Sequence, residues 1–176
     1  MGRDKAELVV AGERLADRAA RVLQTVCDPV LEIGSGRSAL ETVGDDDPHA
    51  GPLAALVTGA GALRTRGYEG AVLLLAVDLP FVDARLLELL TNHPSADSVV
   101  PVAGEMRQSC CARYAPEALA AAADLVARGE RAMRALLSAV PVVEITEPEW
   151  RAVAAVDALA DLDTPEDLAR HGVDDR

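Results

Sequence analysis

The feature that most constrains the fold is an unbroken apolar run that ends in an aspartate and a proline. Residues 73–81 read Leu-Leu-Leu-Ala-Val-Asp-Leu-Pro-Phe, and Gly70 precedes them. A short apolar run bounded in this way predicts a strand buried on both faces, as in a parallel sheet covered by helices. Ligands of such sheets bind beyond the carboxyl ends of the strands, where Asp78 lies. Asp78 is either a ligand for a divalent cation that carries a phosphorylated substrate or part of a turn that stops the strand.

Composition favours one domain and argues against several classes of function. The chain has 176 residues, and 50% of them are hydrophobic, which suffices for one sizeable core. Aromatic residues make up only 2% of the chain and its net charge is −12, and both values argue against a nucleic-acid partner. The negative charge also allows docking to a basic enzyme. The sequence has no apolar stretch of membrane-spanning length and no charged-then-apolar leader. We expect a cytoplasmic protein that does not bind membranes.

Few side chains suit nucleophilic or redox chemistry. Lys5 is the single lysine among 17 basic residues, which suggests that its position needs a compact ammonium group. The cysteines lack the number and spacing of a disulfide framework or a zinc site, and we expect small buried hydrophobes. The histidines fall in predicted loops or near the end of the chain, and we expect them to be solvated. These residues are Cys27, Cys110, Cys111, His49, His93 and His171.

Periodicity and helix-capping residues predict alternating strands and helices. Leu15 begins an amphipathic pattern, Asp83 is a good helix cap, and Pro52 and Pro116 suit first helical positions. The glycine-rich turn at 34–36 follows a short strand but lacks the dinucleotide-binding spacing. The predicted order is helix 15–26, strands 30–33 and 39–43, a helix from 52, strand 71–77, helix 83–92, an antiparallel hairpin over 98–114, helix 116–128, a helix from 129, strand 142–145 and a helix from 164. This β-α-β rhythm predicts an α/β fold with a mostly parallel sheet and a small antiparallel element.

Five short motifs, in order along the chain, resemble those of one enzyme family. Residues 1–6 resemble the end of its glycine-rich signature, 51–53 its Gly-Pro-Leu loop, and 77–81 its metal-binding aspartate motif. Residues 129–131 are similar to a late turn, and 161–168 to its closing segment. Over nearly its whole length the chain thus resembles the molybdenum-cofactor guanylyltransferases, members of a wider nucleotidyltransferase family. The resemblance implies a Rossmann-like, three-layer nucleotidyltransferase fold.

The resemblance also implies roles for individual residues. Lys5 would contact the nucleotide triphosphate, and Asp78 would bind both Mg²⁺ and the nucleotide. Asp45, the first of three consecutive aspartates, matches a nucleotide-contacting position, and Gly51 belongs to the nucleotide-binding Gly-Pro-Leu loop. Asp163 lies where related transferases keep an Asn or Asp near a second metal position.

The implied reaction is transfer of GMP from GTP to the phosphate of molybdopterin, with release of pyrophosphate. An in-line attack on the α-phosphorus needs positioning of the substrates and neutralisation of phosphate charge, which Mg²⁺ and Lys5 would supply. It requires no covalent enzyme intermediate. Residues 129–131 favour GTP. The alternatives are a transferase of the same fold that uses CTP or another acceptor, and a non-catalytic relative that binds the cofactor.

The family signature begins upstream of the first methionine of this chain. The resemblance therefore implies a single nucleotidyltransferase domain over 1–176 from which the first strand and its glycine-rich loop are absent. That strand is central in a doubly wound sheet, so its absence predicts a slot in the core flanked by unpaired backbone groups. Either the natural chain starts earlier or this is a relative that no longer transfers nucleotides, and the presence of Lys5, Asp78 and Asp163 favours the first explanation.

Overall fold

The computed structural model describes residues 5–44 and 51–161 as alternating helices and strands. The helices are η1 (Lys5–Glu7, a 3-10 turn), α1 (Leu15–Gln24), α2 (Pro52–Thr65), α3 (Ala84–Thr91), α4 (Pro116–Ala127), α5 (Met133–Ala139) and α6 (Glu147–Arg151). The strands are β1 (Val9–Val10), β2 (Glu13–Arg14), β3 (Leu31–Ile33), β4 (Glu41–Val43), β5 (Val72–Leu75), β6 (Ser98–Ala103), β7 (Met106–Arg107), β8 (Cys111–Tyr114) and β9 (Val142–Ile145). Within the described ranges, no helix has the length and apolar character needed to cross a bilayer.

Local sequence explains where the main helices begin. The Asp83 carboxylate accepts a hydrogen bond from the backbone N–H of Leu86 at 3.0 Å and caps α3 as the sequence predicts. Pro52 and Pro116 are the first residues of α2 and α4, where a missing N–H costs no helical hydrogen bond. The predicted helix start at Thr164 lies outside the described residues.

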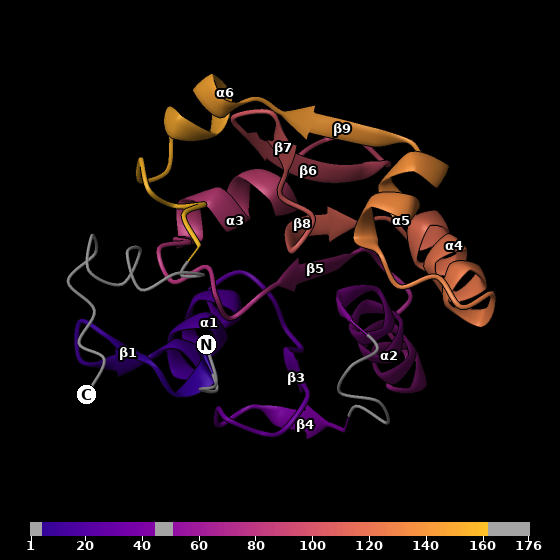
Figure 1. Cartoon of the computed structure of the whole chain (residues 1–176), viewed down its shortest axis with the longest axis horizontal. Coiled ribbons are helices and arrows are strands. Elements are labelled where there is room, and N and C mark those ends of the chain that lie inside the picture. The colour runs from indigo at the N-terminus through magenta and orange to yellow at the C-terminus, as the bar shows by residue number, and fades with distance from the viewer. Residues whose placement is uncertain (1–4, 45–50, 162–176) are drawn as a thin grey trace.

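The central sheet has five strands, and its pairing differs from the expected one (Figure 1). β8 pairs antiparallel with β5 and with β6, β6 pairs antiparallel with β7, and β6 pairs parallel with β9. The expectation of a mostly parallel sheet is therefore not confirmed. The reason is the hairpin over 98–114, because its returning strand β8 inserts between β5 and β6 and pairs antiparallel with both.

Two apolar clusters cover the two faces of this sheet. On one face, α1, α3 and α6 pack against Leu73 and Leu75 of β5 and Val99 of β6. On the other, α2, α4 and α5 pack against Leu74 of β5 and Val100 of β6. Successive side chains of a strand point to opposite faces, so β5 and β6 each contribute to both clusters. The molecule therefore has the expected three layers, helices on either side of a sheet.

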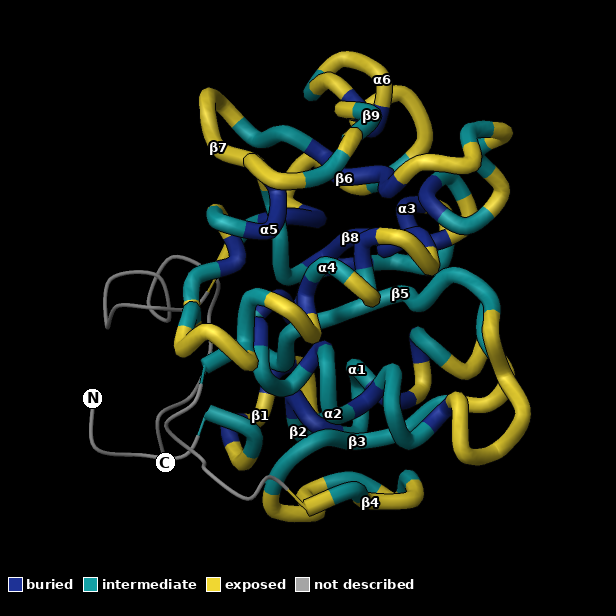
Figure 2. Tube along the Cα trace, turned by 90° about the vertical axis from the view of Figure 1, so that its right-hand side faces the viewer, coloured by how far each residue is buried: buried dark blue, intermediate teal, exposed yellow. Residues whose placement is uncertain are grey.

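β5 is nevertheless less buried than its apolar sequence predicts. Its four residues are all intermediate in exposure, whereas β6 is buried over Ser98–Pro101 (Figure 2). β3 and β4 pair parallel in a separate two-stranded sheet beyond β5, and within the described residues neither of them pairs with β5. A cavity lies along the edge of β5 that faces β3, so the prediction of complete burial is wrong.

Candidate active site

Lys5 and Asp78, 73 residues apart in the sequence, meet beyond the carboxyl end of β5. The Lys5 ammonium Nζ donates a hydrogen bond to Asp78 Oδ2 at 3.3 Å. Their side chains retain 30% and 32% of their exposure, so the pair is reachable from solvent. The structure thus brings together the two residues to which the resemblance assigns catalytic roles.

A small apolar cluster holds the two residues next to each other. Leu8, Val10 and Leu15 pack together, with Val77 and Phe81 from the segment after β5 against them. The first three residues follow Lys5, and the last two flank Asp78. The Arg18 guanidinium on α1 also donates a hydrogen bond to the backbone carbonyl of Pro80. The segment from Lys5 to α1 and the end of β5 are therefore held together by packing as well as by charge.

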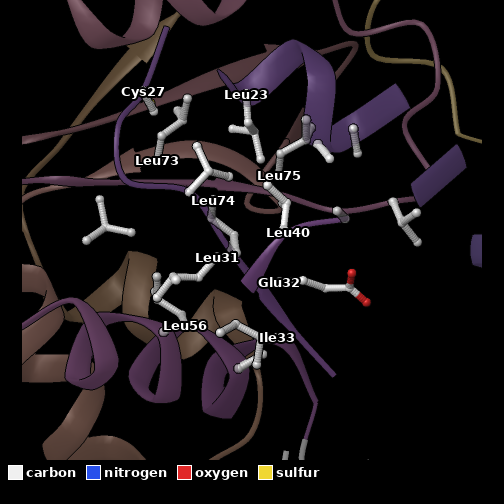
Figure 3. Close-up of a pocket in the computed structure, with 18 of the residues that line it drawn as sticks. Leu23, Cys27, Leu31, Glu32, Ile33, Leu40, Leu56, Leu73, Leu74 and Leu75 are labelled. Atoms are coloured by element: carbon white, nitrogen blue, oxygen red, sulfur yellow. The ribbon is translucent and has the colours of Figure 1, made fainter. Parts of the chain in front are cut away.

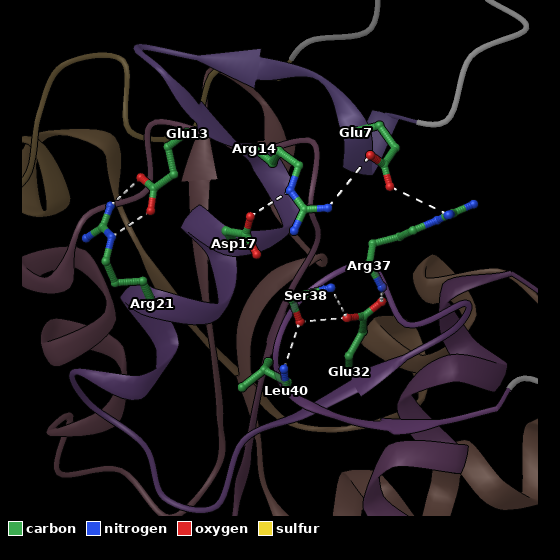
Figure 4. Close-up of polar contacts among 9 residues, drawn as sticks. All are labelled: Glu7, Glu13, Arg14, Asp17, Arg21, Glu32, Arg37, Ser38 and Leu40. Carbon is green, nitrogen blue, oxygen red and sulfur yellow. Dashed lines mark hydrogen bonds and ion pairs between the residues drawn. The ribbon is translucent and has the colours of Figure 1, made fainter.

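The glycine-rich turn after β3 is organised by one carboxylate, that of Glu32. Its oxygens accept hydrogen bonds from the backbone N–H groups of Arg37 at 2.6 Å and Ser38 at 2.8 Å, and from the Ser38 hydroxyl at 2.6 Å (Figure 4). Burial acts to raise the pKa of this carboxyl group. The hydrogen bonds from Ser38, Arg37 and Gly36 outweigh it, and the pKa lies below its ordinary value.

Ion pairs connect this turn to the start of the chain. Glu7 of η1 pairs with Arg37 at 3.6 Å and with Arg14 at 3.7 Å, and Arg14 pairs with Asp17 of α1 at 2.7 Å (Figure 4). Glu7 lies two residues after Lys5 and Arg37 four residues after β3. The carboxyl ends of β3 and β5 therefore lie at the same edge of the molecule, on either side of η1.

Gly51, at the start of α2, lies beside the turn that contains Glu130 and Arg131. Its φ of +84° is a backbone conformation that residues with a side chain rarely adopt, and a Cβ atom there would lie 3.5 Å from the Arg131 carbonyl oxygen. Glu130 caps the adjoining turn by accepting hydrogen bonds from the N–H groups of Arg131 and Ala132, which hold its pKa below the ordinary value. The Gly-Pro-Leu loop and the late turn thus adjoin each other. Lys5 and Asp78 contact each other beyond the end of β5, whereas Gly51 lies beside Arg131 at the start of α2.

The thiols near the site are unsuited to nucleophilic chemistry. Burial raises the pKa of Cys27, and burial with the nearby Asp78 charge raises that of Cys110, despite the hydrogen bond from Ser109. The Cys111 thiol is fully enclosed, and burial raises its pKa to about 12. Cys111 is buried as expected, whereas Cys27 and Cys110 are half-buried.

His93, the one histidine within the described residues, has a structural role. His93 is half-buried, and its Nδ1 accepts a hydrogen bond from the Ser95 N–H at 3.2 Å, a structural role in the turn after α3. His49 and His171 lie outside the described residues.

Asp78 is the one expected metal ligand that the structure describes, since Asp163 lies outside the described residues, as does the nucleotide-contacting Asp45. Over residues 5–44 and 51–161, no three His, Cys, Asp or Glu side chains gather as a metal-binding group. Mg²⁺ is often held by one or two carboxylates together with waters and substrate phosphates. A single half-exposed carboxylate at a strand end fits that mode of binding.

The sequence predicted no individual role for Glu32, Arg37 or Glu130, although Glu130 lies in the late turn at 129–131 that resembles the family. A signal for Glu32 was present, because it is the one acidic residue in the apolar strand over 30–33 and a turn rich in backbone donors follows it. The pairing of Arg37 with Glu7 joins residues 30 positions apart and has no local signal.

Comparisons with known proteins place this chain among nucleotidyltransferases. The family model described as the MobA-like NTP transferase domain matches residues 1–168. A probable molybdenum cofactor guanylyltransferase of Opitutus terrae is 33% identical over 186 residues, covering 97% of this chain and 87% of the relative. A protein of the same name from Mycobacterium avium is 36% identical over 177 residues, covering 92% of this chain and 86% of the relative.

Solved structures agree on the fold. Molybdopterin-guanine dinucleotide biosynthesis protein A from Archaeoglobus fulgidus matches with a TM-score of 0.75 at 22% identity, covering 97% of this chain and 89% of that one. The 2-C-methyl-D-erythritol 4-phosphate cytidylyltransferase from Thermus thermophilus matches with a TM-score of 0.67 at 19% identity, and the match covers 95% of this chain and 91% of that one. At such identities the two structures establish a nucleotidyltransferase-like α/β fold and leave the substrate open.

Proposed function

We propose a function from one premise: the chain belongs to the family of MobA-like NTP transferases, whose model matches residues 1–168. It is therefore a nucleotidyltransferase. We propose that it transfers GMP from GTP to the phosphate of molybdopterin and releases pyrophosphate, a step of molybdenum cofactor biosynthesis. The names of the relatives from Opitutus terrae and Mycobacterium avium, at 33% and 36% identity, support this choice of substrates.

The observation that carries the proposal is the pairing of Lys5 and Asp78 at 3.3 Å beyond the end of β5. An ammonium group and a carboxylate at one strand end form a small site with both charges that a metal-bound triphosphate needs. Each partner neutralises the other while no substrate is bound. We propose that the Lys5 ammonium turns to the phosphate oxygens when the nucleotide enters and leaves the Asp78 carboxylate to the metal.

The reaction requires neutralisation of phosphate charge more than it requires proton transfer. The molybdopterin phosphate oxygen attacks the α-phosphorus, and the bond to the β-phosphate oxygen breaks in line with it. Lys5 offsets the charge that develops on the leaving pyrophosphate. Bound Mg²⁺, which Asp78 and Asp163 would hold, supplies further neutralisation of phosphate charge.

The remaining contacts to the nucleotide belong to the proposal as well. We assign Gly51 to the nucleotide-binding loop because its backbone adopts a conformation suited to glycine at the start of α2. Asp45, in the segment just before it, is proposed to contact the nucleotide.

Calorimetry and turnover test this function. With Mg²⁺ present, we expect GTP to bind more tightly than CTP, and chelation of the metal to remove most of the affinity. Asp78→Asn should lower pyrophosphate release from GTP and molybdopterin by at least about 100-fold, because it removes the metal-binding charge at the reacting centre. Asp124→Asn, an exposed carboxylate on α4, is the matched control and should leave the rate unchanged.

Three outcomes would contradict the proposal. Tighter binding of CTP than of GTP would end the guanylyl assignment. Full turnover of Asp78→Asn would remove Asp78 from the reaction. Unchanged cofactor maturation in cells that carry Asp78→Asn would favour a non-catalytic binding protein.

A further inference from the structure

One face of α1 contacts the segment 77–82, which carries Asp78. Leu15, Arg18 and Val22 lie three and four positions apart, a spacing that places them on the same face of the helix. Leu15 and Val22 belong to the two apolar clusters that hold this segment, and Arg18 lies between them. The side chains of the segment in these clusters are Val77, Leu79, Phe81 and Val82.

Arg18 makes the polar contact in the middle of this face. Its Nε donates a hydrogen bond to the backbone carbonyl of Pro80, a buried residue two positions after Asp78. Arg18 and Pro80 are 62 residues apart in the sequence, so the bond joins two separate elements. A buried carbonyl needs a hydrogen-bond partner, and Arg18 supplies one.

The backbone hydrogen bonds within the segment are long. The Leu79 N–H donates to the Ala76 carbonyl at 3.4 Å, and the Val82 N–H donates to the Leu79 carbonyl at 3.4 Å. Most N–H···O bonds in proteins measure roughly 2.7–3.2 Å. Asp78 lies between these weak turns, so contacts from outside the segment contribute more to its position than they would in a regular element.

The neighbouring face of α1 borders a cavity. Figure 3 shows Leu23 of α1 and Cys27, just beyond the helix, at a cavity of about 640 Å³ along β5. Atoms that line a void lack the dispersion contacts that close packing supplies. The placement of α1 against the end of β5 therefore depends on the face that carries Leu15, Arg18 and Val22.

A second arginine of α1 shares a partner with Arg18. Glu13 accepts hydrogen bonds from Nε and Nη2 of Arg21, both at 2.8 Å (Figure 4), and its carboxylate lies 3.6 Å from Nη1 of Arg18. The Glu13 charge thus offsets both guanidinium groups. The two arginines differ in the hydrogen bond to the Pro80 carbonyl, which Arg18 makes.

We propose that Arg18 is a positioning residue of the nucleotidyl transfer, because its hydrogen bond to the Pro80 carbonyl holds the Asp78 carboxylate against Lys5. For the metal and the nucleotide, this inference rests on the proposed function. A displacement of about 1 Å at a reacting group can lower a rate about 100-fold. Arg18 acts through its N–H donor, and its charge is offset by Glu13.

Two substitutions separate the hydrogen bond from the charge. Arg18→Met keeps a similar length and removes the donor. Arg18→Gln removes the charge but keeps an N–H donor, since the glutamine amide nitrogen is as many bonds from Cα as Nε of arginine. Arg21→Met is the matched control, with the same change on the same helix away from Pro80. Circular dichroism checks that each variant folds.

Zero-length coupling reports the contact between Lys5 and Asp78 without any ligand. A water-soluble carbodiimide condenses the amine and the carboxyl group to an amide, and takes up the released water as it becomes a urea. Lys5 is the one lysine of the chain, so peptide mass spectrometry identifies the product. We expect Arg18→Met to lower the yield at least about fivefold, and Arg18→Gln and Arg21→Met to stay within about twofold of the wild type.

The Mg²⁺ dependence of GTP binding, measured by calorimetry, reports the consequence for the site. Arg18→Met should raise the Mg²⁺ concentration for half-maximal binding at least about tenfold, because Asp78 is no longer held in place. Arg18→Gln and Arg21→Met should change it less than about threefold. A loss of stability that left the folded state unchanged would move neither this concentration nor the coupling yield.

Four outcomes would overturn the proposal. Equal losses in Arg18→Met and Arg18→Gln would show that the charge matters, as in a direct contact with substrate. Unchanged coupling in Arg18→Met, or lower coupling with an unchanged Mg²⁺ requirement, would remove the positioning role. An Arg18→Met protein that did not fold would assign the hydrogen bond to the fold as a whole. A wild type that bound no GTP would contradict the proposed function instead, and the coupling yields would still decide whether Arg18 positions Asp78.

Discussion

Among individual residues, Glu32 has the most consequential set of hydrogen bonds, since one carboxylate holds a whole turn. Glu32→Gln removes the charge that accepts from the Arg37 and Ser38 N–H groups. Hydrogen bonds to charged groups contribute more than neutral ones, so we expect a loss of about 1–3 kcal/mol in the free energy of unfolding at pH 7. Urea denaturation of the wild type and of Glu32→Gln measures this loss in the free energy of unfolding. Glu105→Gln, an exposed acid in the turn between β6 and β7, is the control and should cost nothing.

The pKa of Glu32 adds a pH dependence with a definite sign. Its carboxyl pKa is lowered in the folded state. A lowered pKa means that the stabilisation is present above the unfolded-state pKa and is lost as the pH falls through the folded-state pKa. The difference in stability between the wild type and Glu32→Gln should therefore shrink on acidification from pH 7 to below pH 4.5, the ordinary pKa of the group. A difference that grew on acidification would contradict this account.

At the scale of elements, α2 offers two glycines with opposite expectations. Gly51→Ala at its N-terminal cap forces a residue with a side chain to φ +84° and ψ 175°, a region almost restricted to glycine, which should destabilise the protein by about 1–3 kcal/mol. The new Cβ meets only ordinary contact, so the cost comes from the backbone. Gly61→Ala, inside the same helix with open space around it, should stabilise the protein by about 0.5–1 kcal/mol. Thermal unfolding of both variants checks these two expectations. Stability changes of the same sign in Gly51→Ala and Gly61→Ala would contradict them.

Elements with local signals were predictable from the sequence, and those fixed by distant partners were not. Pro52 and Asp83 mark the starts of α2 and α3 because prolines and caps act on adjacent residues. The antiparallel hairpin over 98–114 was also foreseen, but its position between β5 and β6 depends on pairing across the sheet. The half-exposed state of β5 depends on the cavity beside it, which no pattern within its own residues reveals. At the site, Lys5 and Asp78 were singled out in advance, whereas Arg37 depends on a partner 30 residues away.

At the scale of the whole molecule, Trp150 joins the end of the described chain to the core. Its side chain is 1% exposed, packs in the cluster with α1 and α3, and donates a hydrogen bond from Nε1 to the Val102 carbonyl at 2.8 Å. Trp150→Ala should cost about 3–5 kcal/mol, a large part of the stability of a typical domain. Trp150→Phe keeps most of the volume and should cost about 1–3 kcal/mol. Urea unfolding followed by circular dichroism measures both, and equal losses would show that packing is not the main contribution.

The single lysine of the chain has a practical consequence for chemical labelling. Lys5 is the one side-chain primary amine in the sequence, and it lies against Asp78 with 30% of its side chain exposed. Amine-directed reagents such as activated esters therefore have one lysine to acylate, and it is in the candidate active site. A tag, dye or surface linker attached through a lysine would modify the residue proposed to contact the triphosphate, so immobilisation and labelling of this protein should use another functional group.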